Sequence, residues 1–271
     1  MGLVRKVMVE PFYRIFFGRP LNDDVALERD DWPAGSSALP GARALVVTAG
    51  GVGGFDLSGT ALRFLLAAEG LPYAIHIFPW GHGFGRWFAD LTDVTNRDTQ
   101  ARLLADAMAR FRNASADIPL FFVGKSGGSG VIVKALERME ERSVERVILL
   151  APALSPEYDL STSLRAIARD MVVFWSPLDV FFLGLGTRVF GTADRVRTAG
   201  AGLTSFRMPP SVERPALEAD RATQYAKLRQ VRWTSRMAAS GNLGGHFGPD
   251  SPLFLKKYVV PLLRTGSVDL G

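Results

Sequence analysis

Short apolar runs alternate with amphipathic segments along most of the chain. The apolar runs predict strands at residues 42–50, 73–80, 119–124, 144–152, 169–177 and 229–235. Between them, apolar residues at helical spacing predict helices at 56–70, 97–115 and 131–142, with a closing helix or turn at 251–263. Continuous apolar strands separated by helices are typical of a mostly parallel sheet with helices on both faces. The pattern therefore predicts an α/β fold.

The alternation begins near residue 42 and indicates a single domain whose core covers about residues 42–263 of the 271-residue chain. Residues 1–40 form an N-terminal extension in which no antiparallel strands are evident. Residues 181–228 mix the apolar run FFLGLG with glycine-rich and proline-rich stretches. We expect them to form an excursion over the sheet, of the kind that serves as a cap or lid.

The most apolar window, residues 171–190, is long enough to raise the question of a transmembrane helix. Pro177, Asp179 and two glycines interrupt it, and an aspartate near the centre of a bilayer is costly. We interpret the window as a strand followed by an apolar loop.

Composition narrows the class of protein. Apolar residues make up 47% of the chain, which suits a packed globular protein. The chain has no cysteine, which excludes disulfides, thiolate metal sites and cysteine nucleophiles. The net charge is +5, but the basic residues are scattered among acidic ones, so nucleic acid is not an expected partner. We expect no cofactor and no metal.

The N-terminus lacks an apolar core and a small-residue cleavage site, so we expect no secretory signal and a cytoplasmic location. The same segment is amphipathic. It packs against its own domain or, in the sharper hypothesis, touches a membrane surface through aromatic residues. These residues are Phe12, Tyr13, Phe16 and Phe17.

The stretch FFVGKSGGSG, residues 121–130, supports two interpretations. Its Gly-Lys-Ser resembles the end of a phosphate-binding loop, but that loop needs a glycine where Pro119 stands, and 120–123 are predicted strand. Residues 124–128 also read G-x-S-x-G, the nucleophile elbow, which requires a strand before it, a helix after it and tiny residues around the serine. This context favours Ser126 as a nucleophile over a glycine-rich turn without chemistry.

A serine nucleophile needs a base to take its proton. The chain has three histidines. We assign the base to His246, which follows the last predicted strand and is flanked by glycines that let its loop bring the ring close. His76 lies within a strand, where packing is its expected role, and His82 lies in the loop PWGHGFG.

The base needs a carboxylate that fixes its tautomer and stabilises the imidazolium. Asp179 follows a predicted strand and so lies at the carboxyl end of the sheet, near the elbow. Asp159, after the preceding strand, is the reserve. Asp250 is too close in sequence to His246 to be its natural partner.

With the order Ser126, Asp179, His246, each after a predicted strand, residues 42–263 resemble the α/β-hydrolase family. The resemblance implies an oxyanion hole made of two backbone N–H groups. One would come from Gly127 and the other from Gly51 or Val52, in the glycine-rich loop after the first strand. This loop lacks the family's usual histidine.

The loop also begins a G-x-G-x-x-G dinucleotide fingerprint, but Asp56 stands where the last glycine belongs. Lys125 stands before the nucleophile, where histidine is more familiar in the family. A cation there favours an anionic substrate or faces solvent, and we favour solvent.

Aromatic residues near the carboxyl end of the sheet predict an apolar acyl site, although core packing is an equal alternative. The candidates are Trp80, His82, Phe84, Trp87, Phe181 and Phe182. The sequence thus favours a serine hydrolase that cleaves an ester-like bond of a small acyl substrate through an acyl-enzyme on Ser126, like an esterase or lipase. The alternatives are a noncatalytic binding protein of the same fold and a nucleotide-binding enzyme.

Overall fold

The computed structural model describes residues 41–54, 56–209 and 215–264. The N-terminal extension and the four aromatic residues expected to touch a membrane lie outside the described residues.

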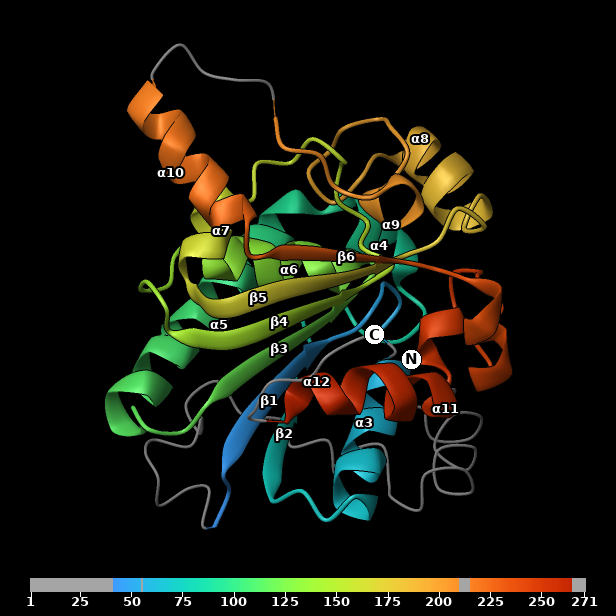
Figure 1. Cartoon of the computed structure of the whole chain (residues 1–271). Coiled ribbons are helices and arrows are strands. Elements are labelled where there is room, and N and C mark those ends of the chain that lie inside the picture. The colour runs from blue at the N-terminus through green and yellow to red at the C-terminus, as the bar shows by residue number, and fades with distance from the viewer. Residues whose placement is uncertain (1–40, 55, 210–214, 265–271) are drawn as a thin grey trace.

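A sheet of six parallel strands forms the centre of the molecule (Figure 1). The strands are β1 (Ala44–Ala49), β2 (Tyr73–Ile77), β3 (Leu120–Lys125), β4 (Val144–Leu150), β5 (Ile167–Trp175) and β6 (Leu228–Arg232). Their order is β2-β1-β3-β4-β5-β6, and every neighbouring pair is parallel. All six predicted strands are therefore confirmed. The chain order reverses between β1 and β3, and ligands of such sheets bind at this point, beyond the carboxyl ends of the strands.

Alternate side chains of each strand enter two separate cores. In β3, Phe122 packs in one core, whereas Phe121 and Val123 pack in the other. Burial on both sides explains why these strands read as continuous apolar runs rather than as alternating ones.

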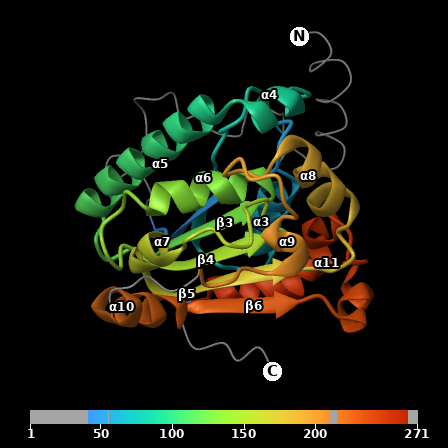
Figure 2. The same cartoon turned by 90° about the horizontal axis from the view of Figure 1, so that it is seen from above.

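Helices cover both faces (Figures 1 and 2). On one face lie α5 (Val94–Ala114) and α6 (Gly127–Leu136), whose apolar residues fill the first core. On the other lie α3 (Leu57–Ala68) and the closing segment, which consists of α11 (Pro252–Phe254), a π-helical turn (Leu255–Val259) and α12 (Val260–Leu263). The predicted α/β fold with helices on both faces is confirmed.

Several short helices were not predicted. They are α4 (Trp87–Thr92), α7 (Ser161–Arg165), α8 (Thr187–Phe190), α9 (Ala201–Thr204) and α10 (Pro215–Tyr225). Most are shorter than two helical turns, so their sequences are too short to show apolar residues at helical spacing.

The expected apolar loop after β5 was wrong. A π-helical turn (Phe181–Gly186) runs directly into α8. Two backbone hydrogen bonds hold this turn at the carboxyl end of the sheet. The Gly200 N–H donates to the Leu183 carbonyl in the turn, and the Ser176 N–H, just after β5, donates to the Gly202 carbonyl. The Leu183 side chain is buried, and it anchors the segment on its inner side.

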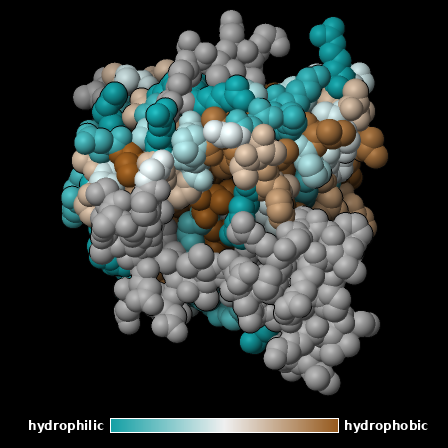
Figure 3. Space-filling view, turned by 90° about the horizontal axis from the view of Figure 1, so that it is seen from below, coloured by the Kyte–Doolittle hydropathy of each residue, from teal (hydrophilic) through white to brown (hydrophobic). Residues whose placement is uncertain are grey.

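The lower face of the molecule is mixed in character. The face seen from below in Figure 1 shows hydrophilic residues beside hydrophobic ones over its described part (Figure 3). No helix of the described residues has the length and apolar character needed to cross a bilayer.

Candidate active site

Ser126 occupies a strained turn between β3 and α6. Its backbone angles, φ 51° and ψ −120°, lie in a region that residues with a side chain rarely adopt. The turn is tight on both sides. A Cβ atom on Gly124 would lie 2.9 Å from Ser129 Cα, and one on Gly128 would overlap the carbonyl oxygens of Ala49 and Gly50. The two glycines of the motif are therefore required by close backbone contacts.

The structure brings Ser126, His246 and Asp179 together. His246 Nε2 lies 2.9 Å from Ser126 Oγ, and His246 Nδ1 lies 2.6 Å from Asp179 Oδ2. All three residues are buried, with exposed fractions of 7%, 9% and 2% for Ser126, His246 and Asp179. In this arrangement the imidazole can accept the hydroxyl proton at Nε2 while its Nδ1–H donates a hydrogen bond to the carboxylate.

Local contacts hold the histidine and the aspartate. The Asp179 N–H donates to the Ser176 carbonyl in a turn after β5 (3.2 Å). The loop that carries His246 is held because Trp233 Nε1 donates to the Asn242 carbonyl (2.8 Å). The ring of Phe182 stacks on the His246 ring, with centroids 4.8 Å apart.

The pKa of His246 is lowered, chiefly because burial disfavours the imidazolium and next because the Lys125 ammonium is close. The hydrogen bond and the charge of Asp179 act in the opposite direction. The lowering keeps His246 neutral near pH 7, which is the form that can accept a proton.

The other sequence candidates lie elsewhere. Asp159, the reserve acid, is exposed and pairs with Arg221 (3.1 Å). His76 is buried in β2, where burial, with a smaller effect of Arg63, lowers its pKa to about 3. Neither is among the residues that line the cavity at Ser126.

The glycine-rich loop after β1 runs alongside Ser126. A Cβ atom on Gly51 would lie 3.6 Å from Ser126 Cβ, and one on Gly127 would lie 3.1 Å from Val52 Cγ1. Gly127 is the first residue of α6, where no helix carbonyl can accept its N–H. The Gly53 N–H is occupied, because it donates to Asp90 Oδ2 (2.7 Å).

A hydrogen-bond network joins this loop to the loop PWGHGFG. Asp90 accepts the Gly53 N–H through Oδ2, and through Oδ1 it accepts the backbone N–H of His82 (2.7 Å). The two ring nitrogens of His82 lie 2.9 Å from Asp90 Oδ1 and 3.1 Å from Asp93 Oδ2. Gly85 also donates to the Gly53 carbonyl (3.0 Å). His82 thus supports the loop beside Ser126, and sequence reasoning missed Asp90 entirely.

A cavity of about 510 Å³ opens at Ser126. Of the predicted substrate-binding residues, Trp80, Trp87, Phe181 and Phe182 line it, whereas His82 and Phe84 do not. Leu183, which follows Phe182, and Val52 of the glycine-rich loop also line the cavity, together with apolar residues that were not predicted. The unpredicted apolar residues are Leu57, Leu91, Ala153, Phe190, Ala193 and Phe247. Together with Trp80, Trp87, Phe181 and Phe182, these residues give the cavity an apolar wall.

The expectation that Lys125 faces solvent was wrong. Lys125 is 5% exposed and lines the cavity. Its ammonium lies 3.8 Å from Asp250 Oδ2 and 5.7 Å from the centre of the Phe247 ring. Asp250, dismissed as a partner of His246, instead pairs with this lysine and accepts a hydrogen bond from Ser58 Oγ (2.9 Å).

The two nucleotide-binding motifs have structural roles. The residues before Lys125 form β3, so no loop is present there to surround a phosphate. Asp56, which interrupts the dinucleotide fingerprint, caps α3 by accepting the Gly59 N–H (2.7 Å).

The strand order, with a strained turn at Ser126 between β3 and α6, matches the α/β-hydrolase fold. No family model and no curated protein matches the sequence.

Among solved structures, the chain is similar to a predicted CIB-like hydrolase from Thermoplasma acidophilum, at 14% identity over 83% of this chain and 87% of that one, with a TM-score of 0.47. It is also similar to Est1E from Butyrivibrio proteoclasticus, at 12% identity over 82% and 88% of the two chains and a TM-score of 0.44. A third similar structure is a cutinase-like protein from Cryptococcus sp., at 12% identity over 82% and 95%, with a TM-score of 0.42. Identities this low concern the fold alone.

Proposed function

We propose that this protein is a serine hydrolase that cleaves an ester-like acyl bond through an acyl-enzyme on Ser126. One observation carries the proposal. Beside an apolar cavity, the His246 imidazole is hydrogen-bonded to the Ser126 hydroxyl at 2.9 Å and to the Asp179 carboxylate at 2.6 Å. A structural role alone gives no reason for a strained backbone, a neutral buried base and a buried carboxylate at the same point.

In the first half of the reaction, Ser126 Oγ attacks the carbonyl carbon while its proton passes to His246 Nε2. Asp179 stabilises the imidazolium that forms. The carbonyl oxygen becomes an oxyanion, the ester C–O bond then breaks, and His246 gives its proton to the departing alcohol. In the second half a water molecule, deprotonated by His246, attacks the acyl carbon. The bond from that carbon to Ser126 Oγ then breaks, and His246 returns the proton to Ser126 Oγ as the acid leaves.

The oxyanion is held by the Gly127 N–H and by a second N–H from Gly51 or Val52. The Gly53 N–H is committed to Asp90, which supports one of the two earlier residues as the donor. Gly127 adds the positive end of the α6 dipole. Each such donor contributes about 3 kcal/mol to transition-state stabilisation.

The substrate is a small molecule with an apolar acyl group. The cavity has a volume within the usual range for small-molecule sites, and Trp80, Leu183 and Phe190 are among its apolar lining residues. Burying the acyl chain there stabilises the transition state by about 0.8 kcal/mol for each methylene removed from water.

Hydrolysis of p-nitrophenyl butyrate by the purified protein tests the proposal. We expect Ser126→Ala to lower kcat by at least about a thousandfold, since the nucleophile is absent. Ser129→Ala is the matched control, because Ser129 is also buried in α6 and its hydroxyl has no hydrogen-bond partner among the described residues. Equal turnover by the wild-type protein and Ser126→Ala would reject the assignment.

A further inference from the structure

The helical segment after β5 exposes its apolar side chains. Phe181, Leu185 and Val189, spaced four residues apart along Phe181–Phe190, are 72%, 57% and 53% exposed. Surface helices of globular proteins normally place apolar side chains inward. Of the large apolar side chains in this segment only Leu183 is buried, so the others leave an apolar stripe on the surface.

The stripe continues onto a neighbouring helix. Trp87 and Phe88 of α4 are 50% and 56% exposed, and both contact Phe190 edge to face, with centroids 6.4 and 6.3 Å apart. Figure 2 shows α4 and α8 on the same side of the molecule. We call these six residues the apolar rim: Trp87, Phe88, Phe181, Leu185, Val189 and Phe190. Contiguous exposed apolar surface of this kind marks an interaction site.

The rim adjoins the cavity at Ser126. Trp87, Phe181 and Phe190 each line that cavity and are also at least 37% exposed. An apolar chain could therefore pass from the rim to Ser126 along apolar side chains, without crossing a polar surface.

Four arginines lie close to rim residues in the sequence. Arg86 precedes Trp87, Arg188 lies between rim positions on α8, and Arg195 and Arg197 follow in the next loop; all four are exposed. Within the described residues, none of the four lies at ion-pair distance from a carboxylate. Asp194, the acidic residue of this loop, accepts hydrogen bonds from the Ser155 N–H (2.8 Å) and the Ser155 hydroxyl, and it forms no ion pair with these arginines.

We propose that the apolar rim docks on an anionic lipid surface, and that the substrate is an ester-bearing lipid drawn from that surface. Aromatic and aliphatic side chains beside arginines that form no ion pair within the described residues are the combination that binds the boundary between headgroups and acyl chains. The arginines favour an anionic lipid surface over a protein partner of apolar character. The substrate part rests on the proposed function, whereas the docking part stands without it.

Vesicle flotation with Ser126→Ala protein tests the docking, because this variant leaves the lipid intact. We expect binding to vesicles of phosphatidylcholine mixed with phosphatidylglycerol, and much weaker binding to phosphatidylcholine alone. Arg188→Gln should lower the partition coefficient about fivefold, since each arginine near an anionic surface contributes to binding by about this factor. Arg110→Gln on α5, also exposed, is the matched control and should leave the partition coefficient unchanged.

The double variant Leu185→Ser with Val189→Ser tests the apolar part, because neither residue lines the cavity. We expect at least about a tenfold loss of vesicle binding. Both side chains are more than half exposed, so the thermal unfolding midpoint should be unchanged.

Each remaining outcome separates the hypotheses. Absence of vesicle binding, with ester hydrolysis intact, overturns the docking and leaves the proposed function standing. Equal binding to both vesicle types overturns the anionic partner, and binding that survives the double variant overturns the rim as the surface. A dimer that the double variant dissociates, without vesicle binding, means that a second copy of the chain covers the rim. Rim-dependent binding by a protein that hydrolyses no ester supports docking and rejects the proposed function.

Discussion

Replacing Ser126 by glycine should stabilise the protein relative to replacing it by alanine. Both variants remove the hydroxyl and its hydrogen bond to His246, so the difference between them reports the backbone alone. Ser126 has φ 51°, and alanine keeps that strain because it has a Cβ atom. Glycine adopts the same angles without steric cost.

The size of the effect follows from two opposing contributions. A non-glycine residue in such a region costs about 1–3 kcal/mol. Glycine costs about 0.4–1 kcal/mol more than alanine through the entropy of the unfolded chain. The net expectation is that Ser126→Gly has a free energy of unfolding about 1 kcal/mol larger than Ser126→Ala. For a chain of this size that is an increase of about 2–4 °C in the unfolding midpoint.

Thermal and urea unfolding of the two variants, followed by circular dichroism, provides the measurement. Ser129 gives the control pair, because it lies inside α6 near Ser126 and is also buried. There the sign should reverse, with Ser129→Gly less stable than Ser129→Ala by about 1 kcal/mol. If Ser126→Gly is the less stable of its pair, the elbow is not strained and the reasoning fails.

Three predictions concern the reaction. Asp179→Asn should lower kcat for p-nitrophenyl butyrate by about 10⁴-fold, because the amide no longer holds His246 in the tautomer that accepts a proton at Nε2; a change below tenfold would contradict it. Lys125→Met should move the acid limb of the kcat/KM pH profile to higher pH. The Lys125 ammonium lowers the pKa of His246, so its removal raises that pKa. Because the neutral ring is the active form, activity is lost as pH falls through the pKa of His246. An unchanged limb would show that the lysine charge does not act on the base. Asp90→Asn should lower kcat by about tenfold or more and change KM less, because the loop held through Gly53 carries the proposed oxyanion donor.

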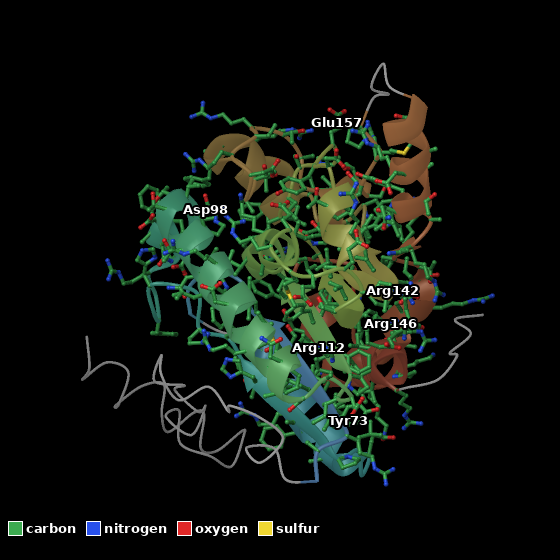
Figure 4. All side chains as sticks on the ribbon, turned by 90° about the vertical axis from the view of Figure 1, so that its left-hand side faces the viewer. Tyr73, Asp98, Arg112, Arg142, Arg146 and Glu157 are labelled. Atoms are coloured by element: carbon green, nitrogen blue, oxygen red, sulfur yellow. The ribbon has the colours of Figure 1, made fainter. Side chains whose placement is uncertain are left out.

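Asp98→Asn is the control for Asp90→Asn. Asp98 lies near one end of α5 (Figure 4) and pairs with Lys134 (3.2 Å) rather than with the glycine-rich loop. A merely structural loss should lower activity in parallel with stability, whereas loss of loop positioning should change kcat without a matching change in the unfolding midpoint. Equal kinetics of the two variants would remove Asp90 from the positioning of the loop.

The convergence of the three site residues could be predicted because each follows a strand. Ser126 follows β3, Asp179 follows β5 and His246 comes after β6, and these strands are parallel. Parallel strands end at the same edge of a sheet, so order along the chain becomes proximity in space. The glycines two residues before and two residues after Ser126 also indicated the tight turn, because their spacing reflects close backbone contacts.

The burial of Lys125 could have been predicted from its position in β3. Side chains alternate along a strand, so Lys125 shares a face with Phe121 and Val123, and both of these are buried. Position in β3 therefore directs the lysine inward, toward Asp250. Its proximity to Asp250 depends on the loop that follows β6, and no local pattern encodes that contact.

The network of Asp90 and His82 could not be predicted from the sequence. An aspartate inside a short helix and a histidine in a glycine loop are typical of many surfaces, and their roles arise only when the loops after β1 and β2 come together. The helical segment at Phe181–Phe190 is a similar case. Its apolar residues suggested burial, and only the tertiary structure shows which of them remain on the surface.

Reaction with a fluorophosphonate probe, followed by mass spectrometry of the peptide that carries Ser126 and Ser129, tests the central claim most directly. Only a serine activated by its histidine attacks phosphorus at a useful rate. The account predicts a single adduct, located on Ser126, that is absent from Ser126→Ala and strongly slowed in His246→Ala. An intact wild-type protein that stays unlabelled at Ser126, under conditions that label a known serine hydrolase, would contradict it.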